Sequence, residues 1–225
     1  MELLDWAGVL AAVAPVVAIA GGVLRSARRR ARARRRWATL ARERGWSLTE
    51  ERLRGREVTT LRGSVGRAKL LAVAMDRGRD EDPPGADRVG GTWVVLELAT
   101  PLDLGLIVVA GSLRGALADR QGPAATMVDA LLDHAWPGTR LDGEDVRFHG
   151  DPDFDRDFIV RARDAAGATR LLDPQARAAI RGVLESSPVG AVTDGGALVV
   201  FPEPHAELDA VLAWLAELEQ RLGRR

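Results

Sequence analysis

The chain has 225 residues, of which 46% are apolar, 28% charged and 4% aromatic, and its basic and acidic side chains balance at 32 each. This length suits one domain or two small ones with a sizeable core. The apolar content excludes a disordered chain, which is poor in apolar residues and carries a large net charge. Cysteine is absent, which excludes disulfide scaffolds, thiolate zinc sites and cysteine nucleophiles.

The first predicted element is a membrane span. Residues 6–24 carry no charged side chain, and at about 1.5 Å per residue they reach about 28 Å, close to the roughly 30 Å of a bilayer's hydrocarbon core. We therefore predict a transmembrane helix over residues 1–24. The alternative is a secretory signal peptide, which is disfavoured because Glu2 and Asp5 make the preceding residues acidic. Small residues at helical spacing, such as Ala14, Ala18 and Gly22, predict a homodimer through this helix.

The next feature is a run of arginines. Residues 25–36 hold eight arginines and no acid, which by the positive-inside rule lies on the cytoplasmic side. The prediction is a single-pass protein of the cell inner (plasma) membrane, with its N-terminus outside and its C-terminal domain cytoplasmic. Nucleic-acid binding is the alternative, and it is disfavoured because the chain beyond residue 36 is net acidic. We expect these arginines to contact anionic lipid headgroups: Arg25, Arg28, Arg29, Arg30, Arg32, Arg34, Arg35 and Arg36.

A strand-rich subdomain is predicted over residues 46–122. The basic run continues into an amphipathic helix that stops at Gly45, so residues 25–45 form one juxtamembrane helix. Residues 56–75 alternate apolar and polar side chains around Gly63 and Gly66, which predicts a β-hairpin. A Pro- and Gly-containing loop over 77–91 separates it from two further strands. Four consecutive strands with short links predict an antiparallel meander.

An α+β subdomain is predicted over residues 123–225. Its elements are a helix over 123–136, a strand over 158–163, a helix opened by Asp173 and Pro174, a hairpin over 190–201 and a last helix with an apolar stripe. The fold class is therefore α+β: an N-terminal transmembrane helix continuing into a basic helix, then antiparallel sheet segments packed with helices.

Signatures of catalysis are absent from the sequence. There is no P-loop, dinucleotide fingerprint, zinc-protease motif or nucleophile elbow. The three histidines, His134, His149 and His205, lie in different contexts without metal-ligand spacing. No catalytic residue, cofactor or metal ligand is predicted from the sequence.

Residues 142–157 form the strongest candidate for a cation site in the sequence, because they hold seven carboxylates and His149. A calcium loop does not fit, since Arg156 stands where glycine is needed and Ala162 where the bidentate glutamate should be. The favoured interpretation is a solvated acidic turn leading into a strand, with Phe154 and Phe158 as core anchors. The alternative is a cation site using Asp151, Asp153 and Asp155.

Part of the chain resembles a bacterial protein family. The shared pattern is D-P-D-F-D-R-D-F-I-V-R at residues 151–161, then Pro174 opening a helix, V-T-D-G-G-A-L-V-V-F at 192–201 and a closing leucine-rich helix. It resembles the C-terminal part of a family of membrane-anchored proteins that carry an α+β domain of unknown function. The resemblance implies a membrane location and an α+β fold, and it carries over no catalytic residue.

The functional prediction follows from these elements. We expect a single-pass membrane-anchored protein whose cytoplasmic α+β domain binds or scaffolds a protein partner, without catalysis. One alternative is a membrane-tethered metal-dependent hydrolase that uses the 142–157 segment. The other is recognition of anionic lipid by the arginine run.

Overall fold

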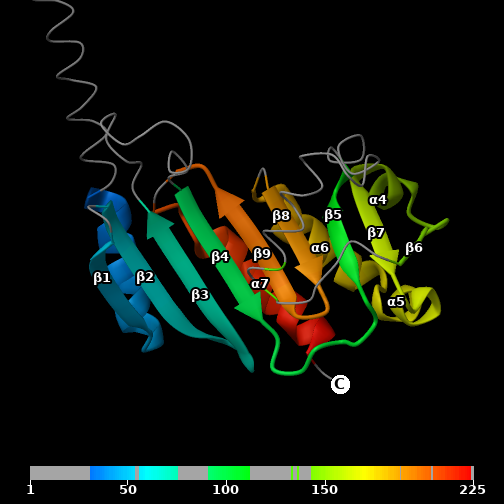
Figure 1. The fold of residues 1–225 in the computed structure, drawn as a ribbon, viewed down its shortest axis with the longest axis horizontal. Helices are drawn as coiled ribbons and strands as arrows, with labels where there is room; N and C mark the ends of the chain where they lie inside the picture. Colours follow the sequence, from blue (N-terminus) through cyan, green and yellow to red (C-terminus); the bar gives the residue numbers. More distant parts are fainter. Residues whose placement is uncertain are drawn as a thin grey trace, which may run out of the picture.

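The computed structural model describes residues 31–53, 56–75, 91–111, 133, 136, 143–187, 189–203 and 205–223. Nine strands form one antiparallel sheet with the order β1-β2-β3-β4-β9-β8-β5-β7-β6 (Figure 1). The strands are β1 (Ser47–Leu53), β2 (Arg56–Val65), β3 (Ala68–Met75), β4 (Gly91–Glu97), β5 (Ile107–Ala110), β6 (Glu144–Asp145), β7 (Phe158–Ala162), β8 (Val189–Thr193) and β9 (Gly196–Phe201).

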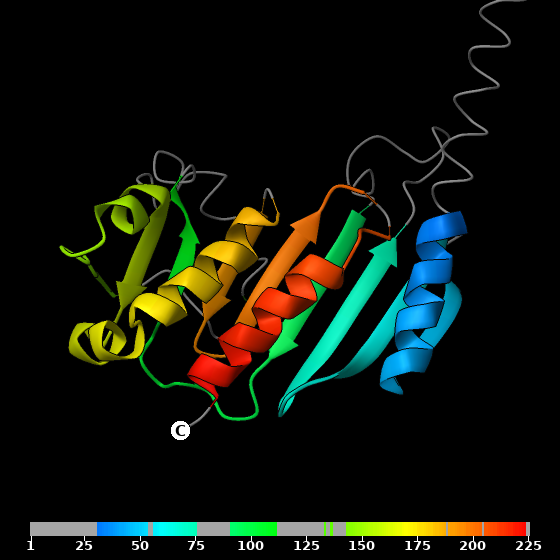
Figure 2. The same ribbon diagram turned by 180° about the vertical axis from the view of Figure 1, so that it is seen from behind.

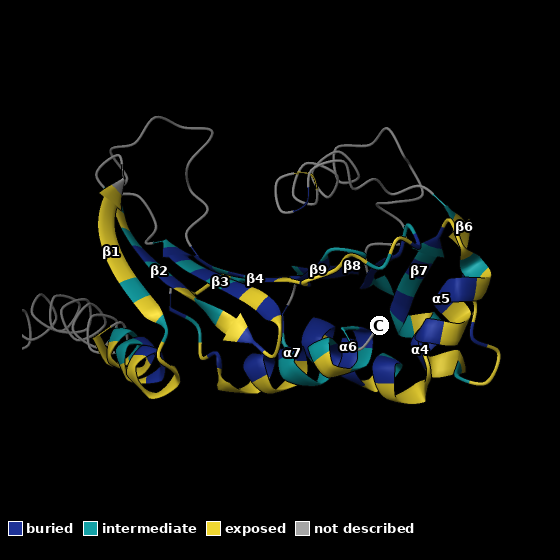
Figure 3. Cartoon of the chain, turned by 90° about the horizontal axis from the view of Figure 1, so that it is seen from below, coloured by how far each residue is buried: buried dark blue, intermediate teal, exposed yellow. Residues whose placement is uncertain are grey.

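The helices of the described ranges given below lie along one face of this sheet, as Figures 2 and 3 show from two directions. A helix over residues 31–44 lies beside β1 and β2. The other helices are α4 (Pro152–Asp157), α5 (Ala165–Leu171), α6 (Pro174–Glu185) and α7 (Asp209–Leu222). Helices α6 and α7 pack against each other over the middle of the sheet.

The main core fills the space between the sheet and the helices. In β3, for example, Leu70, Ala72 and Ala74 are buried while their neighbours in the strand are exposed or only partly buried, as the alternation of side chains in a strand requires. Helix α7 contributes an apolar stripe that includes Leu215 and Leu218. The main core is therefore shared by strands and helices from both halves of the chain.

Local signals place most helix ends and turns where the sequence predicts them. The helix over 31–44 ends at Gly45, whose φ of 66° is the left-handed conformation that glycine adopts without strain. The carboxylate of Asp173 accepts a hydrogen bond from the backbone N–H of Ala176 at 2.7 Å and so caps α6. Gly66, with a φ of 59°, lies in the β2–β3 turn. The predicted hairpins β2–β3 and β8–β9 are confirmed.

The predicted four-strand meander is wrong. Strand β4 pairs with β9, and β5 pairs with β8 and β7, so the β8–β9 hairpin lies between two strands that are neighbours in sequence. The β4–β5 connection is held to the tip of this hairpin, because the carboxylate of Asp194 accepts hydrogen bonds from the N–H groups of Gly105 and Leu106 at 2.6 and 2.9 Å. A long-range contact therefore replaces the local pairing.

The predicted fold class is also corrected. Residues 46–122 and 123–225 do not supply separate sheet segments, because the β4–β9 ladder joins strands from both ranges in one continuous sheet. Strand β1 was not predicted from the sequence, since the SLTEERL segment shows no clear alternation. The described fold is dominated by its nine-stranded sheet.

The transmembrane part of the prediction is corrected as well. Across the described ranges, none of the helices has both the length and the hydropathy that crossing a bilayer requires. The longer helices are amphipathic: α7, with 14 residues, turns one apolar stripe to the sheet and exposes its other side. The stretch over residues 6–24 that carried the prediction lies outside the described residues. The transmembrane helix and the single-pass inner-membrane location are not retained.

Two further predicted elements fall outside the described residues. These are the loop over 77–91, except Gly91, and the helix over 123–136, of which only Asp133 and Trp136 are described.

Candidate functional site

Two arginines of the arginine run form ion pairs within the domain. Arg25, Arg28, Arg29 and Arg30 lie outside the described residues. Of the remaining four arginines, Arg34 forms an ion pair with Glu57 of β2, and Arg36 forms one with Glu207 just before α7. Arg32 and Arg35 are exposed. Two of the predicted headgroup contacts are therefore contacts within the domain.

An aromatic anchor holds this helix to the sheet. The side chain of Trp37 is 2% exposed, and its Nε1 donates a hydrogen bond to the carbonyl oxygen of Ala206 at 3.0 Å. Its ring contacts the ring of His205, which in turn lies 2.9 Å from the hydroxyl of Thr59. The hydrogen bond and charge of Arg34 lower the pKa of Glu57 below its ordinary value. The ion pairs and the indole together fix the helix to β2 and to the segment that precedes α7.

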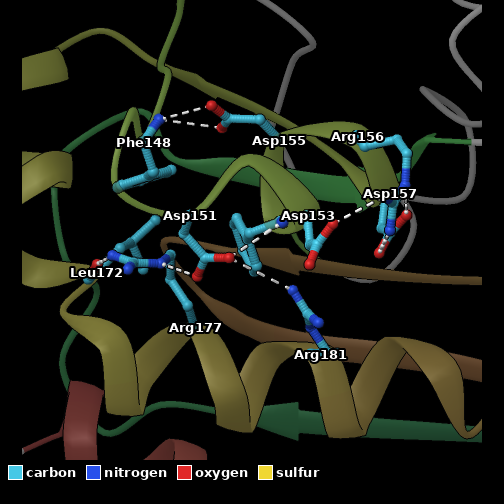
Figure 4. A network of polar contacts seen from close by, with 10 residues as sticks. Phe148, Asp151, Asp153, Asp155, Arg156, Asp157, Leu172, Arg177 and Arg181 are labelled. Atoms are coloured by element: carbon cyan, nitrogen blue, oxygen red, sulfur yellow. Dashed lines mark hydrogen bonds and ion pairs between the residues drawn. The ribbon is translucent and has the colours of Figure 1, made fainter.

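The acidic segment builds a structural network (Figure 4). Asp151 caps α4 by accepting a hydrogen bond from the N–H of Phe154 at 3.2 Å. The same carboxylate accepts one from Nε of Arg177 on α6 at 2.9 Å, and Nη2 of Arg181 lies 3.7 Å away. The hydrogen bond from Arg177 is the main reason why the pKa of Asp151 is lowered.

Arg177 connects this carboxylate to the aromatic anchors. Its Nη1 donates to the carbonyl oxygen of Leu172 at 2.8 Å, and its guanidinium lies 4.8 Å from the centroid of the Phe148 ring. Phe154 and Phe158 are buried at 0% and 3% exposure, as the sequence predicts for core anchors. The network therefore joins α4 to α6.

The other carboxylates of the segment point to different partners. Asp155 accepts hydrogen bonds from the backbone N–H of Phe148 at 2.9 and 3.0 Å. Arg156 pairs with Asp153 at 2.7 Å and with Asp157 at 2.9 Å, and its hydrogen bond with Asp157 raises the pKa of its guanidinium. Since α4 is a short helix, the alternate acids do not share a face as they would on a strand.

This arrangement does not support the predicted cation alternative. Among the residues that the structure describes, no three His, Asp or Glu side chains converge as metal ligands would. Asp151, Asp153 and Asp155 are instead directed to an arginine on α6, an arginine on α4 and a backbone N–H. Of the histidines, His149 is exposed, His205 is buried at the helix contact, and His134 lies outside the described residues.

A different candidate is the face of the sheet opposite the helices. Strands β4, β9, β8 and β5 carry apolar side chains on both faces, so that a second hydrophobic cluster lies on the side without described helices. Cross-strand pairing runs from Leu71 to Val95 and Leu198 in one row, and from Val73 to Trp93 and Val200 in the next. We define the apolar face as Leu71, Val73, Trp93, Val95, Ile107, Val109, Ile159, Ala191, Leu198 and Val200.

The apolar face is unevenly covered. Ile107, Val109, Ala191 and Leu198 are buried, and Trp136 packs against them. On β3, β4 and the end of β9 the side chains are only partly buried: Leu71, Val73, Trp93, Val95 and Val200. Apolar surface on these three strands therefore remains accessible to a partner.

Polar residues border this face at one end. The row of the sheet that contains Ile107 also has an ion pair between Lys69 and Glu97 at 3.8 Å, and another between Asp145 and Arg161 at 3.0 Å. The buried Thr193 lies in the same row. An apolar centre with a polar border is typical of binding surfaces.

Trp93 of the apolar face and Trp136, which packs against this face, share an unusual feature. The Nε1 atoms of Trp93 and Trp136 are buried, and no acceptor for either is found among the described residues. The indole N–H of Trp37, by contrast, has its acceptor. Buried indole donors normally find a partner, so these two donors mark a place where the described chain leaves hydrogen bonds unmade.

Sequence reasoning missed this face. The sequence feature that indicates this face is the run of apolar residues in TWVVLELA and ALVVF. These segments lack the apolar–polar alternation of a strand that exposes one face to solvent. The position of Trp136 could not be found this way, because Trp136 contacts strand residues that lie far from it in the sequence.

Comparison with known proteins adds little to this geometry. No family model and no curated protein matches the chain, so the family resemblance of the 146–222 region stays a prediction. The crystal structure of the mycobacterial trehalose monomycolate transport factor A, TtfA, is similar with 11% sequence identity and a TM-score of 0.48, over 84% of this chain and 93% of that chain. At these values the similarity supports no assignment of function.

Proposed function

We propose that this chain is a binding protein without catalytic activity, and that it binds its partner on the apolar face. The observation that carries the proposal is the partly exposed apolar surface of Leu71, Val73, Trp93, Val95 and Val200 on neighbouring strands. Contiguous apolar surface is costly in water and commonly marks a binding site. The acidic segment supports this choice indirectly, because its carboxylates serve structural contacts.

The proposal can be tested with anilinonaphthalene sulfonate, a dye that becomes fluorescent on apolar surfaces. Leu71→Thr and Val95→Thr replace apolar side chains by one that suits a strand. Because each removes part of the apolar contact, we expect each to weaken dye binding about threefold, and the double variant about tenfold. Fluorescence titration of the folded proteins measures the effect.

The matched control is Leu48→Thr. Leu48 is also a partly buried strand leucine, but it packs against the main core on the helix side of the sheet. Its substitution should leave the dye affinity unchanged, while near-ultraviolet circular dichroism verifies that each variant is folded. Equal affinities for the native chain and the double variant would overturn the proposal, as would the absence of dye binding.

A further inference from the structure

The helix over residues 31–44 carries arginines with and without an acidic partner. Arg34 and Arg36 form ion pairs with glutamates of the domain. Three other arginines of the helix are exposed, and among the residues that the structure describes no acidic side chain pairs with them: Arg32, Arg35 and Arg42. The paired arginines fix the helix to the domain, and the three exposed ones keep their positive charge available to a partner.

The three exposed arginines lie on one stripe of the helix. Residues 32, 35, 39 and 42 follow the three- and four-residue spacing that places side chains on one face of a helix, and all four are exposed. Nη2 of Arg42 donates a hydrogen bond to the hydroxyl of Thr39 at 3.3 Å within this stripe. The stripe runs over about 15 Å, because each of its ten steps rises about 1.5 Å. We call Arg32, Arg35 and Arg42 the arginine stripe.

The arginine stripe lies on the side of the helix that points away from the core. The opposite side of the helix is formed by Trp37, Leu40 and Ala41, which are buried in the main core. The helix itself lies at the β1 end of the sheet, as Figure 2 shows. Guanidinium groups bind phosphate through charge-assisted hydrogen bonds, so the stripe offers an extended surface an anionic phosphate partner.

We propose that the arginine stripe binds the phosphate groups of an anionic lipid surface, with the helix lying parallel to that surface. Because the apolar side of the helix is packed against the domain, the contact is electrostatic and involves lipid headgroups only. It requires no helix that crosses a bilayer. This inference is independent of the proposed function, since no residue of the apolar face takes part in it.

A lipid surface fits the arginine stripe better than a nucleic acid does. Proteins that bind nucleic acid track its backbone with a positively charged groove, whereas acidic side chains are exposed close to this helix in the sequence: Glu43 near its end and Glu50 and Glu51 on β1. A polyanion that wraps around this end of the molecule would meet these carboxylates. A flat layer of headgroups contacts only the outermost side chains of the helix.

The experiment measures co-sedimentation of the full chain with vesicles. One set of vesicles contains phosphatidylcholine alone, and the other contains phosphatidylcholine and phosphatidylglycerol in equal parts. At about 0.01 M salt, where charges act over about 30 Å, we expect the chain to bind the anionic vesicles at least about a hundredfold more tightly. The triple variant Arg32→Gln/Arg35→Gln/Arg42→Gln should bind them about a hundredfold more weakly than the native chain, since each arginine near anionic lipid contributes about fivefold.

The matched control removes the same charge elsewhere. Arg62→Gln/Arg67→Gln/Arg170→Gln changes three exposed arginines outside this helix and should retain the native affinity for anionic vesicles. Near-ultraviolet circular dichroism verifies that both triple variants are folded. At about 1 M salt, where charges act over only about 3 Å, the difference between the two variants should disappear.

Two results would overturn the proposal directly. They are equal binding of the native chain to neutral and anionic vesicles, and equal affinities of the two triple variants for anionic vesicles. A duplex DNA of random sequence is the competing probe. If the native chain binds this DNA more tightly than anionic vesicles, and the stripe variant loses that binding, the partner is a nucleic acid and the lipid assignment is wrong.

Discussion

The carboxylate of Asp151 shows how one residue of the acidic segment holds two helices together. It caps α4, and it also accepts a hydrogen bond from Arg177, whose side chain is 12% exposed and reaches a carbonyl at the N-terminal end of α6. Because the guanidinium favours the charged carboxylate, the pKa of Asp151 lies below its ordinary value of 3.8. The acidic segment holds many carboxylates, and it is stable because these carboxylates are paired with arginines or backbone N–H groups.

Replacing this residue tests that role. Asp151→Asn keeps a capping side chain but loses the ion pairs, and we expect the free energy of unfolding at pH 7 to fall by about 1 kcal/mol. Since the folded pKa is lowered, the contribution of the carboxylate is present above the unfolded value near 4 and is lost as the pH falls through the folded value. Denaturant unfolding at pH 7, 5 and 3 should show the difference shrinking at the lowest pH.

The matched control for this prediction is Asp153→Asn. Asp153 pairs with Arg156 on the surface, where both side chains are more than half exposed, so its substitution should have no measurable effect at any of these pH values. A loss in Asp151→Asn that is the same at pH 3 and pH 7 would contradict the paired carboxylate.

At the scale of elements, the helix over residues 31–44 combines an apolar anchor with surface ion pairs. Trp37→Ala removes a side chain that is 2% exposed, and we expect a loss of about 3–5 kcal/mol in the free energy of unfolding. Arg34→Gln and Arg36→Gln should each cost less than about 1 kcal/mol, because their partners Glu57 and Glu207 are largely exposed. Urea unfolding of the three variants gives the ranking.

The salt dependence of the same variants provides the control. The small losses in the two arginine variants should decrease further at high ionic strength, whereas the loss in Trp37→Ala should persist. If either arginine variant lost as much stability as Trp37→Ala, the anchor would be electrostatic.

Elements differ in how far the sequence predicts them. Helix α6 and the β8–β9 hairpin were predictable because Asp173, Pro174 and the Asp194–Gly196 turn are local signals. The partner of β4 was not, since its contact with β9 joins residues about a hundred positions apart. For the candidate site, the arginine run was evident in the sequence, but its pairing with Glu57 and Glu207 and the donors of the apolar face depend on the tertiary structure.

The β4–β9 junction can be tested at one glycine. Gly196 has a φ of 147°, and a Cβ atom there would collide with the carbonyl oxygen of Leu96 on β4. Gly196→Ala should therefore lower the free energy of unfolding by about 3 kcal/mol. Gly150→Ala is the control: a Cβ atom at this position meets nothing within 4 Å, so its effect should stay within about 0.5 kcal/mol. Thermal and urea unfolding of both variants measure the difference.

At the scale of the whole molecule, the shared sheet makes the two halves of the described chain depend on each other. The main core includes Leu61 on β2, Val108 on β5 and Leu215 on α7 in one cluster, and the sheet continues from β1 to β6 without a break. Two independent subdomains would instead each need their own core. The protein should therefore unfold as one cooperative unit.

Leu61→Ala distinguishes these two possibilities. Leu61 is fully buried on β2, so we expect its truncation to cost about 2–5 kcal/mol. In a cooperative sheet, native-state hydrogen exchange should show this loss in full for the amides of β5 and β7, at the other end of the molecule, as well as for those of β2 and β3. Wild-type protection retained in β5 and β7, with a loss confined to β1–β3, would show that the halves unfold separately. The urea transition of this variant should have the same slope m as that of the wild type only if the sheet opens as a whole, because m follows the surface exposed in unfolding.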